Sequence, residues 1–376
     1  MVEVSGSVAP GLEGVRRQFE ANFDERGEVG ASVCALVDGE VVVDLWGGLA
    51  HPGSGEPWRW DTLVDFYSAG KPLVACTLLR LVDAGLVGLD TPIASLWPAF
   101  AAGGKGGATV RHALSHQAGV PAIGPELTDD DLWSWDAMVD ALAATPAWFA
   151  PGSRVVYHTN TYGHLVGEIA RRLTGELPGT LLARIARAVG ADVHVGVEPP
   201  DLDRCATVVF EPRPLGTGAP AGPDHPEAAM VQRGYFNPPG YSSFGVVNTS
   251  RWRRAQIPST NGHGSAAGLA AFYAALLQPG LVLSGALTAE ATRPQAEGHC
   301  PVLGEWVAFG LGFVPTSPRR RFGPNPGAFG HFGTGGAVGF ADPARRVAFG
   351  YVMNHVVPRW QSSRNRALID ALYDAL

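Results

Sequence analysis

The segments with strand-like patterns lie at the two ends of this chain, and the segments between them have helical patterns. Near the N-terminus, residues 31–37 and 40–46 are rich in apolar residues and are joined by Asp38-Gly39, a pair that strongly favours a tight hairpin turn. Near the C-terminus, residues 306–313 and 346–353 have the same β character. This order predicts an antiparallel sheet built from both chain ends, with the middle of the chain inserted between them.

Helical periodicity marks the segments that flank these strands and most of the middle. Residues 12–23 and 363–376 carry apolar residues on one side, and we expect both to be helices that cover the sheet. A stretch rich in glycine and proline, 212–239, predicts a long surface or pocket-lining loop. Other helices are expected at residues 71–84, 110–115, 133–144, 162–173 and 268–277.

The length and these patterns predict an α+β fold with two parts. A chain of 376 residues with 46% hydrophobic and 17% charged residues can bury a large core and is not disordered. We expect residues 1–67 and 295–376 to form a discontinuous α/β domain, an antiparallel sheet flanked by helices. Residues 68–294 are expected to form a mostly helical insertion domain.

The charge of the chain argues against nucleic acid or an anionic membrane as a partner. Its 28 basic and 35 acidic residues give a net charge of −7, whereas binding to phosphates needs a basic surface. One short basic run, Arg319-Arg320-Arg321, lies between a proline and a glycine, and we expect it to be a solvated loop.

The cysteines and the N-terminus indicate a cytoplasmic protein. The N-terminus has an early acidic residue and no apolar core of signal-peptide length. No run of eighteen apolar residues occurs, so no transmembrane helix is expected. Four cysteines are too few and too scattered for a disulfide scaffold, namely Cys34, Cys76, Cys205 and Cys300.

The first candidates for chemistry are Ser68 and Lys71, in a segment that leads into the helix predicted at 71–84. If Ser68 begins this helix, the two side chains lie one turn apart, and the lysine amine can hydrogen-bond the hydroxyl. Burial near the helix N-terminus would lower the pKa of the lysine, and the helix dipole would favour the oxyanion that forms when the serine attacks a carbonyl. The alternative is an N-cap serine followed by a surface lysine, because Ser-x-x-Lys alone is a weak pattern.

The small number of lysines favours a reactive Ser68–Lys71 pair over an N-cap serine and a surface lysine. Of the 28 basic residues only two are lysines, Lys71 and Lys105. Lys105 lies in a Gly-Gly-Lys-Gly-Gly loop, whereas Lys71 follows a serine by three residues. Arginine could not replace a lysine that acts as a base, because a guanidinium does not deprotonate in proteins.

Two later segments are candidates for the rest of a site. Residues 155–163 place Tyr157 before an amphipathic helix, where a tyrosine is commonly a cap or core residue. Residues 329–342 contain five glycines in a β-like segment. Such glycines let a ligand or another backbone approach closely, or they mark a turn-rich edge strand.

In this order and spacing, the three segments resemble the penicillin-recognising serine hydrolases, and most of all the class C β-lactamases and the β-lactamase-like family VIII carboxylesterases. The signature of that superfamily is Ser-x-x-Lys, then Tyr-x-Asn, then Lys-Thr-Gly. Ser68 and Lys71 match the first element. Tyr157 matches the second, with Thr159 in place of the asparagine. His331 stands where the third has its lysine, and both departures are more typical of the esterase branch.

The resemblance covers most of the chain, including residues 37–48 and 248–264 and the final strand and helix. It implies a β-lactamase/transpeptidase-like fold, with the active site in the groove between the two domains. Ser68 would be the acylated nucleophile, and Lys71 and Tyr157 would share proton transfer, either of them being the resting base.

The oxyanion hole would consist of the backbone N–H groups of Ser68 and Thr334. His331 and Gly333, the first and last residues of the third element, would also contribute to substrate binding, with His331 near Tyr157 and the polar end of the substrate. A family lysine at this position helps to hold a substrate carboxylate, whereas a histidine, mostly neutral at pH 7, does this poorly. Together with the threonine at position 159, this argues against strong β-lactamase activity.

The implied reaction is acyl transfer from a small-molecule ester or amide, with short-chain esters as the expected substrates and no cofactor. A transacylase, a peptide cyclase or a peptidase would use the same acyl-enzyme, and weak β-lactamase activity is a further alternative. A non-catalytic binding protein on this fold would be expected to lack Ser68, Lys71 or Tyr157, and all three are present.

Other motifs are weaker. His112 and His116 are four residues apart on a predicted helix, but no His-Glu-x-x-His motif is completed, so we expect a structural role and no metal site. No Gly-x-Ser-x-Gly occurs, which argues against an ordinary α/β-hydrolase, and no phosphate-binding Gly-x-x-x-x-Gly-Lys-Ser/Thr occurs.

Overall fold

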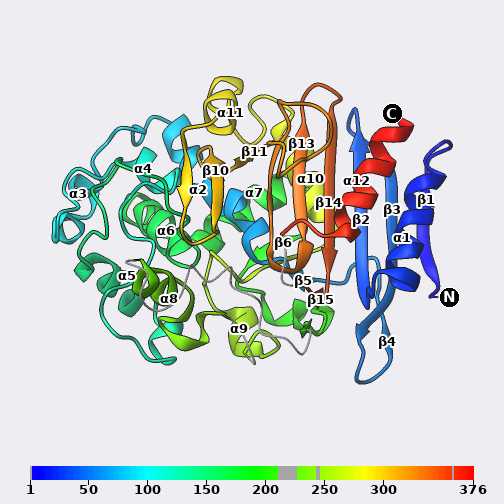
Figure 1. Cartoon of the computed structure of the whole chain (residues 1–376), viewed down its shortest axis with the longest axis horizontal. Helices are drawn as coiled ribbons and strands as arrows, with labels where there is room; N and C mark the ends of the chain where they lie inside the picture. The colour runs from blue at the N-terminus through cyan, green and yellow to red at the C-terminus, as the bar shows by residue number, and fades with distance from the viewer. Residues whose placement is uncertain (1, 211–226, 243–245, 358–359) are drawn as a thin grey trace.

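A computed structural model of the chain describes residues 2–210, 227–242, 246–357 and 360–376. The long strands and both chain termini lie at one end of the molecule, and most helices of the middle segment gather at the other end (Figure 1). The structure contains no helix, within these residues, that is long and apolar enough to span a bilayer.

The main sheet is antiparallel, and both chain ends contribute to it, as predicted. β2 pairs with β14 from Ala31 opposite Met353 to Val37 opposite Val347, which joins strands from the two ends of the chain in one sheet. The strand order is β1 (Val4–Val8), β3 (Glu40–His51), β2 (Gly30–Val37), β14 (Val347–Met353), β13 (Val338–Asp342), β12 (Phe329–Phe332) and β11 (Val314–Pro315), with β4 (Glu56–Pro57) beside β3.

The hairpin predicted around Asp38-Gly39 is confirmed. Val37 pairs with Glu40, and both turn residues have positive φ, 53° for Asp38 and 86° for Gly39. Positive φ at both central residues is the requirement of the tight turn that matches the twist of two antiparallel strands.

The strand predicted at residues 306–313 is only partly right. β10 (Glu305–Phe309) pairs with β9 (Ala296–Cys300) in a separate two-stranded sheet and does not join the main sheet. It ends because the N–H of Gly310 donates to the carbonyl of Phe313 (2.8 Å), which closes a turn before β11.

The loop predicted at residues 212–239 is also corrected. Residues 212–226 lie outside the described residues, but Ala228–Phe236 form helix α8. This part of the stretch contains no proline, and its Met230, Val231 and Gly234 are buried, so packing of one helical face outweighs the composition of the stretch as a whole.

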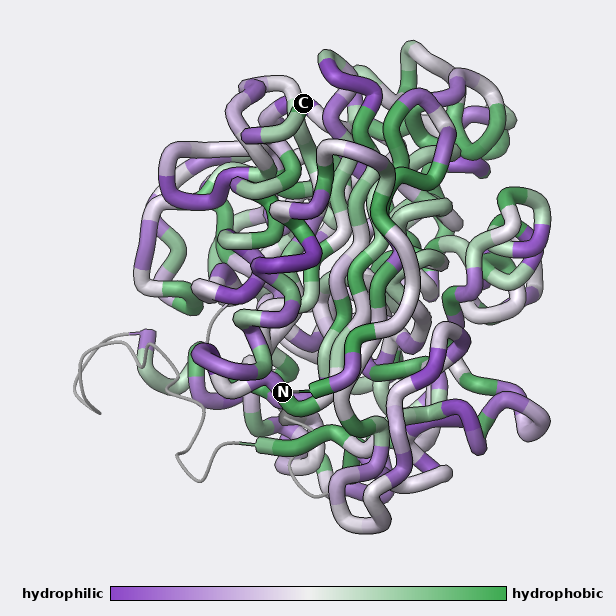
Figure 2. The backbone as a smooth tube through the Cα atoms, turned by 90° about the vertical axis from the view of Figure 1, so that its right-hand side faces the viewer, coloured by the Kyte–Doolittle hydropathy of each residue, from purple (hydrophilic) through white to green (hydrophobic). Residues whose placement is uncertain are grey.

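Helices cover both faces of the main sheet. α1 (Glu13–Glu25) and α12 (Ser363–Ala375), the helices predicted at the chain ends, pack against each other, and α10 (Ala266–Leu276) packs against β2, β13 and β14. Gly350 of β14 lies under α10, where a Cβ would overlap a helix carbonyl, whereas the adjacent Tyr351 points toward Glu28, the ion-pair partner of Arg364 in α12. Successive side chains of a strand point to opposite faces, so α10 and the α1–α12 pair lie on opposite sides. The strands between them are among the most hydrophobic parts of the chain (Figure 2).

α10 bears on the predicted domain division. It belongs to residues 68–294, the predicted helical domain, yet it packs against the sheet. The boundaries therefore stay predictions, and the middle segment contributes to both parts of the molecule.

Helix α2 (Lys71–Asp83) lies at the centre of the helical part. It packs against α6 (Thr161–Thr174) and α7 (Pro178–Val189), and its first nine residues are all buried. A helix segment that is enclosed on every side has no polar face, so these nine residues are apolar except Lys71 and Thr77, and the polar Arg80 and Asp83 lie in the exposed last turn. The five middle helices predicted from the sequence are confirmed to within two residues at each end, the other three being α4 (Val110–Leu114), α5 (Trp135–Ala144) and α10. Further helices are α3 (Ile93–Leu96), α9 (Ser250–Arg254) and α11 (Gly285–Thr292).

A buried ion pair joins the two ends of the chain on the α1–α12 side of the sheet. Nη1 of Arg364 lies 3.1 Å from Oε1 of Glu28, and both side chains are almost fully buried. The hydroxyl of Tyr351 donates to the other carboxylate oxygen. Burial raises the pKa of Glu28 to about 7, and the charge of Arg364 acts in the opposite direction.

At pH 8 to 9, above the raised pKa of Glu28, substituting Glu28→Gln is expected to destabilise the fold by about 3 kcal/mol, because it leaves the Arg364 guanidinium buried without a counter-charge. Urea unfolding monitored by tryptophan fluorescence measures this. The rate of the reaction per folded molecule should not change, since no residue of the candidate site contacts this pair. A midpoint equal to that of the wild type would contradict the prediction.

Candidate active site

Ser68 and Lys71 lie together in a buried position at the start of α2. Ser68 is in a 3₁₀ turn, Tyr67–Gly70, and α2 begins directly after it. Nζ of Lys71 lies 3.0 Å from Oγ of Ser68, at hydrogen-bond distance. The spacing of three residues thus places both side chains on one face, as the sequence predicts.

The amine of Lys71 is held by two backbone carbonyls as well as by the serine. Nζ donates to the carbonyl oxygens of Thr159 (2.8 Å) and Ser259 (2.9 Å) and lies 4.9 Å from the ring centre of Tyr157. No carboxylate of the described residues forms an ion pair with it. Burial lowers the pKa of Lys71 well below its usual value. A neutral amine has two N–H donors, and the two carbonyls can accept both, which leaves the nitrogen lone pair for the Ser68 hydroxyl.

Tyr157 precedes α6, and its backbone and ring are both fixed by neighbours. Its N–H donates to Sγ of Cys300 (3.3 Å), and its ring stacks on Phe309 at 5.5 Å between centres. Its hydroxyl is buried and makes no hydrogen bond of good geometry with any described residue. Burial raises the pKa of Tyr157 well above its usual value, and the nearby Ser68 hydroxyl lowers it only in part. The side chain is therefore a neutral phenol at neutral pH.

The end of β12 brings the third motif to the nucleophile. A Cβ at Gly333 would overlap the carbonyl oxygen of Phe66, so only glycine lets this strand end lie against the turn before Ser68. Thr334, at the start of the next 3₁₀ turn, is partly exposed. β12 is not the outermost strand, but the short β11 pairs only with its first two residues, Phe329 and Gly330.

His331 is a buried, neutral histidine in this arrangement. Its Nδ1–H donates to the carbonyl of Phe332 (2.6 Å), and its Nε2 has no partner among the described residues. Its ring centre lies 6.2 Å from that of Tyr157. Burial and the nearby Lys71 lower the pKa of His331 to about 3. It therefore brings no positive charge to the site at neutral pH.

Ser259 is a site residue that sequence reasoning missed. It lies in the segment 248–264, which shares the family resemblance, but its contribution is a backbone carbonyl, and any residue type has one. Its Oγ donates to the carbonyl of Asn160 and accepts from the N–H of Gly163, both at 2.6 Å. These two bonds hold the Ser259 loop against the start of α6, and so hold the carbonyl that binds Lys71.

An ion pair beside the site corrects the prediction for Arg320, whereas Arg319 and Arg321 are exposed as predicted. Arg320 is not solvated: its side chain is 20% exposed, its Nε donates to Oε1 of Glu305 (2.9 Å), and its guanidinium lies 4.5 Å from the ring centre of Trp360. Trp360 in turn contacts the rings of Tyr157 and His331. The nearly buried Glu305 outweighs the solvation that the basic run would otherwise favour at Arg320, and its second carboxylate oxygen lies 3.2 Å from Nε of the exposed Arg319.

The weaker candidates have structural roles. Nδ1 of His112 accepts from the N–H of Thr109 as part of the N-terminal cap of α4, and His116 is buried and accepts from the N–H of His158. No group of three or more potential metal ligands occurs in the part of the chain that the structure describes. Lys105 is buried in its loop, where its amine donates to the carbonyls of Ala102 (2.6 Å), Ala143 (3.0 Å) and Thr145.

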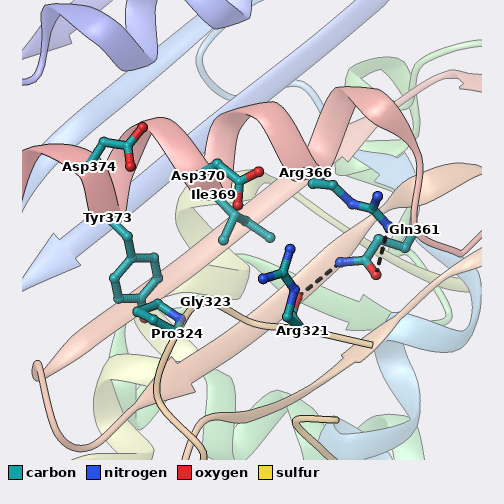
Figure 3. A pocket seen from close by; sticks show the side chains of 9 residues that line it. All are labelled: Arg321, Gly323, Pro324, Gln361, Arg366, Ile369, Asp370, Tyr373 and Asp374. Atoms are coloured by element: carbon teal, nitrogen blue, oxygen red, sulfur yellow. Dashed lines mark hydrogen bonds between the residues drawn. The ribbon is translucent and has the colours of Figure 1, made fainter. Parts of the chain in front are cut away.

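One surface cavity of about 470 Å³ lies between α12 and residues 321–324 (Figure 3). Arg321 and Arg366 reach it from its two sides together with Asp370 and Asp374. It contains none of the six residues predicted for the site. The cavity is therefore separate from the candidate site at Ser68.

The chain is similar in sequence and in structure to known proteins. The sequence model of the Beta-lactamase family matches residues 15–373. The curated protein "Esterase/beta-lactamase LipL" of Mycobacterium tuberculosis is 31% identical over 372 residues, which are 94% of this chain and 83% of that protein. The crystal structure of a family VIII carboxylesterase superposes with a TM-score of 0.90 and 36% identity over the full length of both chains. A penicillin-binding protein homologue from Caulobacter crescentus superposes with a TM-score of 0.89 and 38% identity, also over both full chains.

Proposed function

The chain belongs to the beta-lactamase family and is a serine hydrolase of the carboxylesterase type, and from this premise we propose that Ser68 is its acylated nucleophile. The observation that carries the proposal is the 3.0 Å contact between Ser68 Oγ and an amine whose other partners are two backbone carbonyls. A serine hydroxyl becomes an effective nucleophile only when a base within hydrogen-bond reach takes its proton.

Lys71 is the resting base in this proposal, and Tyr157 is the proton donor. Burial favours the neutral form of both side chains, the amine of Lys71 and the phenol of Tyr157. A neutral amine can accept the serine proton, whereas a neutral phenol can give a proton to the leaving group. Of the two candidates that the sequence left open, the proposal thus takes Lys71 as the base.

The reaction then proceeds in two steps. Oγ of Ser68 attacks the ester carbonyl carbon as its proton passes to Lys71, and the oxyanion accepts hydrogen bonds from the N–H groups of Ser68 and Thr334. The intermediate collapses as the bond between the carbonyl carbon and the alcohol oxygen breaks. This oxygen takes the phenol proton of Tyr157, and Lys71 returns to Tyr157 the proton that it took from Ser68. Water attacks the acyl-enzyme by the same route, which releases the acid and restores Ser68.

We propose short-chain, uncharged acyl esters as the substrates, within the wider class of small-molecule substrates. His331 is neutral at pH 7, and Arg320 is paired with Glu305. The amine of Lys71 is bound by Ser68 and by two backbone carbonyls. A carboxylate next to the scissile bond would therefore be buried without a counter-charge, which is costly. A cytoplasmic location and the absence of a nucleic-acid partner are further proposals, supported by four free thiols and a net charge of −7.

The substrate proposal is tested with two esters that share one leaving group. p-Nitrophenyl butyrate should have a kcat/KM at least about tenfold higher than the mono-p-nitrophenyl ester of succinic acid, which adds a carboxylate to a chain of similar length. Equal values would overturn the preference for uncharged acyl groups. The relative's name, esterase/beta-lactamase, makes a chromogenic cephalosporin the third substrate in the same assay, and we expect slower turnover of it than of the butyrate.

A further inference from the structure

The turn that carries Ser68 is held in an unfavourable backbone conformation. Tyr67, the residue directly before the nucleophile, has a φ of 50°, in the left-handed region that a tyrosine rarely adopts. Such a conformation costs of the order of 1 kcal/mol or more and persists only where the surroundings impose it. It lets the chain turn from β5 (Val64–Asp65) into the 3₁₀ turn that presents Ser68.

The carboxylate of Asp65 is the group that holds this turn. Its Oδ1 accepts the N–H of Tyr67 at 2.8 Å, and its Oδ2 accepts the indole N–H of Trp252 at 2.9 Å. Asp65 is 1% exposed and Trp252 is fully buried. Because both oxygens have a fixed donor, the carboxylate cannot rotate away from Tyr67.

The backbone around Asp65 is fixed as well. β5 pairs with β8 (Gly262–Gly264), so that Asp65 lies opposite His263, and the N–H of Phe66 donates to the carbonyl of Gly262 (2.9 Å). Because the strand that carries Asp65 is fixed, its side chain has one position, and the backbone N–H that it binds is held in place as well.

The charged and titratable groups around Asp65 do not form an ion pair with it. Arg253 acts on Asp65 only through its electric field, His263 is neutral because burial lowers its pKa to about 3, and burial raises the pKa of Cys205 to about 11. Burial raises the pKa of Asp65 itself to about 8. In either protonation state both of its oxygens can accept a hydrogen bond.

We propose that Asp65 is a positioning residue for acyl transfer: through the Tyr67 N–H it holds the left-handed turn that aims Ser68 Oγ at Lys71. The proposal rests on the proposed function, since it requires Ser68 to be the nucleophile. Asp65 does not touch the substrate, and its effect should therefore appear in the rate of acylation and not in the affinity for substrate.

Asp65→Asn tests the proposal, because the amide has a single acceptor oxygen for the two donors that Asp65 serves. If the oxygen faces Trp252, the Tyr67 N–H is left unpaired; if it faces Tyr67, the amide NH₂ opposes the indole N–H. We expect the second-order rate of Ser68 labelling by a fluorophosphonate, and kcat for p-nitrophenyl butyrate, to fall about 10- to 100-fold with KM nearly unchanged.

Trp252→Phe provides the matched rescue. It removes the competing donor and keeps an aromatic ring, so that the amide in Asp65→Asn/Trp252→Phe can accept from Tyr67 again. The double variant should regain most of the acylation rate of Trp252→Phe, whereas Asp65→Ala/Trp252→Phe should not. If Asp65 contributed only to stability, the two substitutions would each lower the free energy of unfolding, and their effects would add in the double variant. The acylation rate of the folded protein would then be the same in all variants.

Glu28→Gln is the stability control, since it is expected to lower stability without changing the acylation rate. Asp65→Asn that is labelled at the wild-type rate while folded would overturn the positioning role, and so would a double variant slower than either single one. Failure of the proposed function is distinct, because wild-type protein would then show no label on Ser68 in peptide mapping.

Discussion

Ser68→Ala is expected to abolish ester turnover and fluorophosphonate labelling while the chain stays folded. Without Oγ no acyl-enzyme can form, and removal of the nucleophile from a serine hydrolase costs about 10⁴-fold or more in kcat. The substitution removes one hydrogen bond, that with Lys71, and leaves the amine its two carbonyl partners. Such a loss costs about 1 kcal/mol of stability, a small part of what a domain has.

The measurement combines p-nitrophenyl butyrate turnover with intact mass and peptide mapping after labelling. Circular dichroism and thermal unfolding of the same samples control for folding. Wild-type protein should gain one label at Ser68, and the alanine variant none. Equal turnover by the two proteins would contradict the nucleophile assignment, and a label without ester turnover would favour the transacylase or peptidase alternative.

Lys71→Met is expected to lower kcat/KM for the same ester about 10³-fold. Methionine has a similar length and no amine, so the base that takes the serine proton is lost, and general-base catalysis of this kind contributes about 10²- to 10⁴-fold. The carbonyls of Thr159 and Ser259 lose their donor, so a loss of stability is also expected.

Lys105→Met is the matched control, because the chain's other lysine is also buried and also donates to backbone carbonyls. It should lose stability for the same reason and keep its activity per folded molecule. Loss of activity in both variants to the same extent would show that the effect of Lys71→Met comes from unfolding and would contradict its role as the base.

The pH dependence of kcat/KM has a definite sign in this mechanism. Lys71 acts as a base only when it is unprotonated, and its pKa is lowered by burial, so activity is present above that pKa and is lost as the pH falls through it. Tyr157, with its raised pKa, keeps its proton over the same range. A profile measured from pH 4 to 9 that rises toward acid would contradict Lys71 as the base.

Much of the candidate site could be proposed from the sequence because its motifs are local or belong to a widespread family pattern. Ser68 and Lys71 are three residues apart, so helical geometry alone brings their side chains together. Tyr157 and His331 are predicted only by the family resemblance. In the structure, Nζ of Lys71 lies 4.9 Å from the ring centre of Tyr157, and the ring centres of Tyr157 and His331 are 6.2 Å apart. Their roles in proton transfer and substrate binding remain proposals that the variants above test.

The sequence by itself determined the antiparallel sheet from both chain ends, the central helices and the family, since hydrophobic periodicity, turn residues and short motifs are all encoded locally. The tertiary structure decided the electrostatics of the site. The carbonyls that hold Lys71 come from residues 88 and 188 positions away, and the indole that fixes Asp65 is 187 positions away. Backbone carbonyls carry no residue signature, and burial, which sets the protonation of Lys71 and His331, arises only when distant segments pack together.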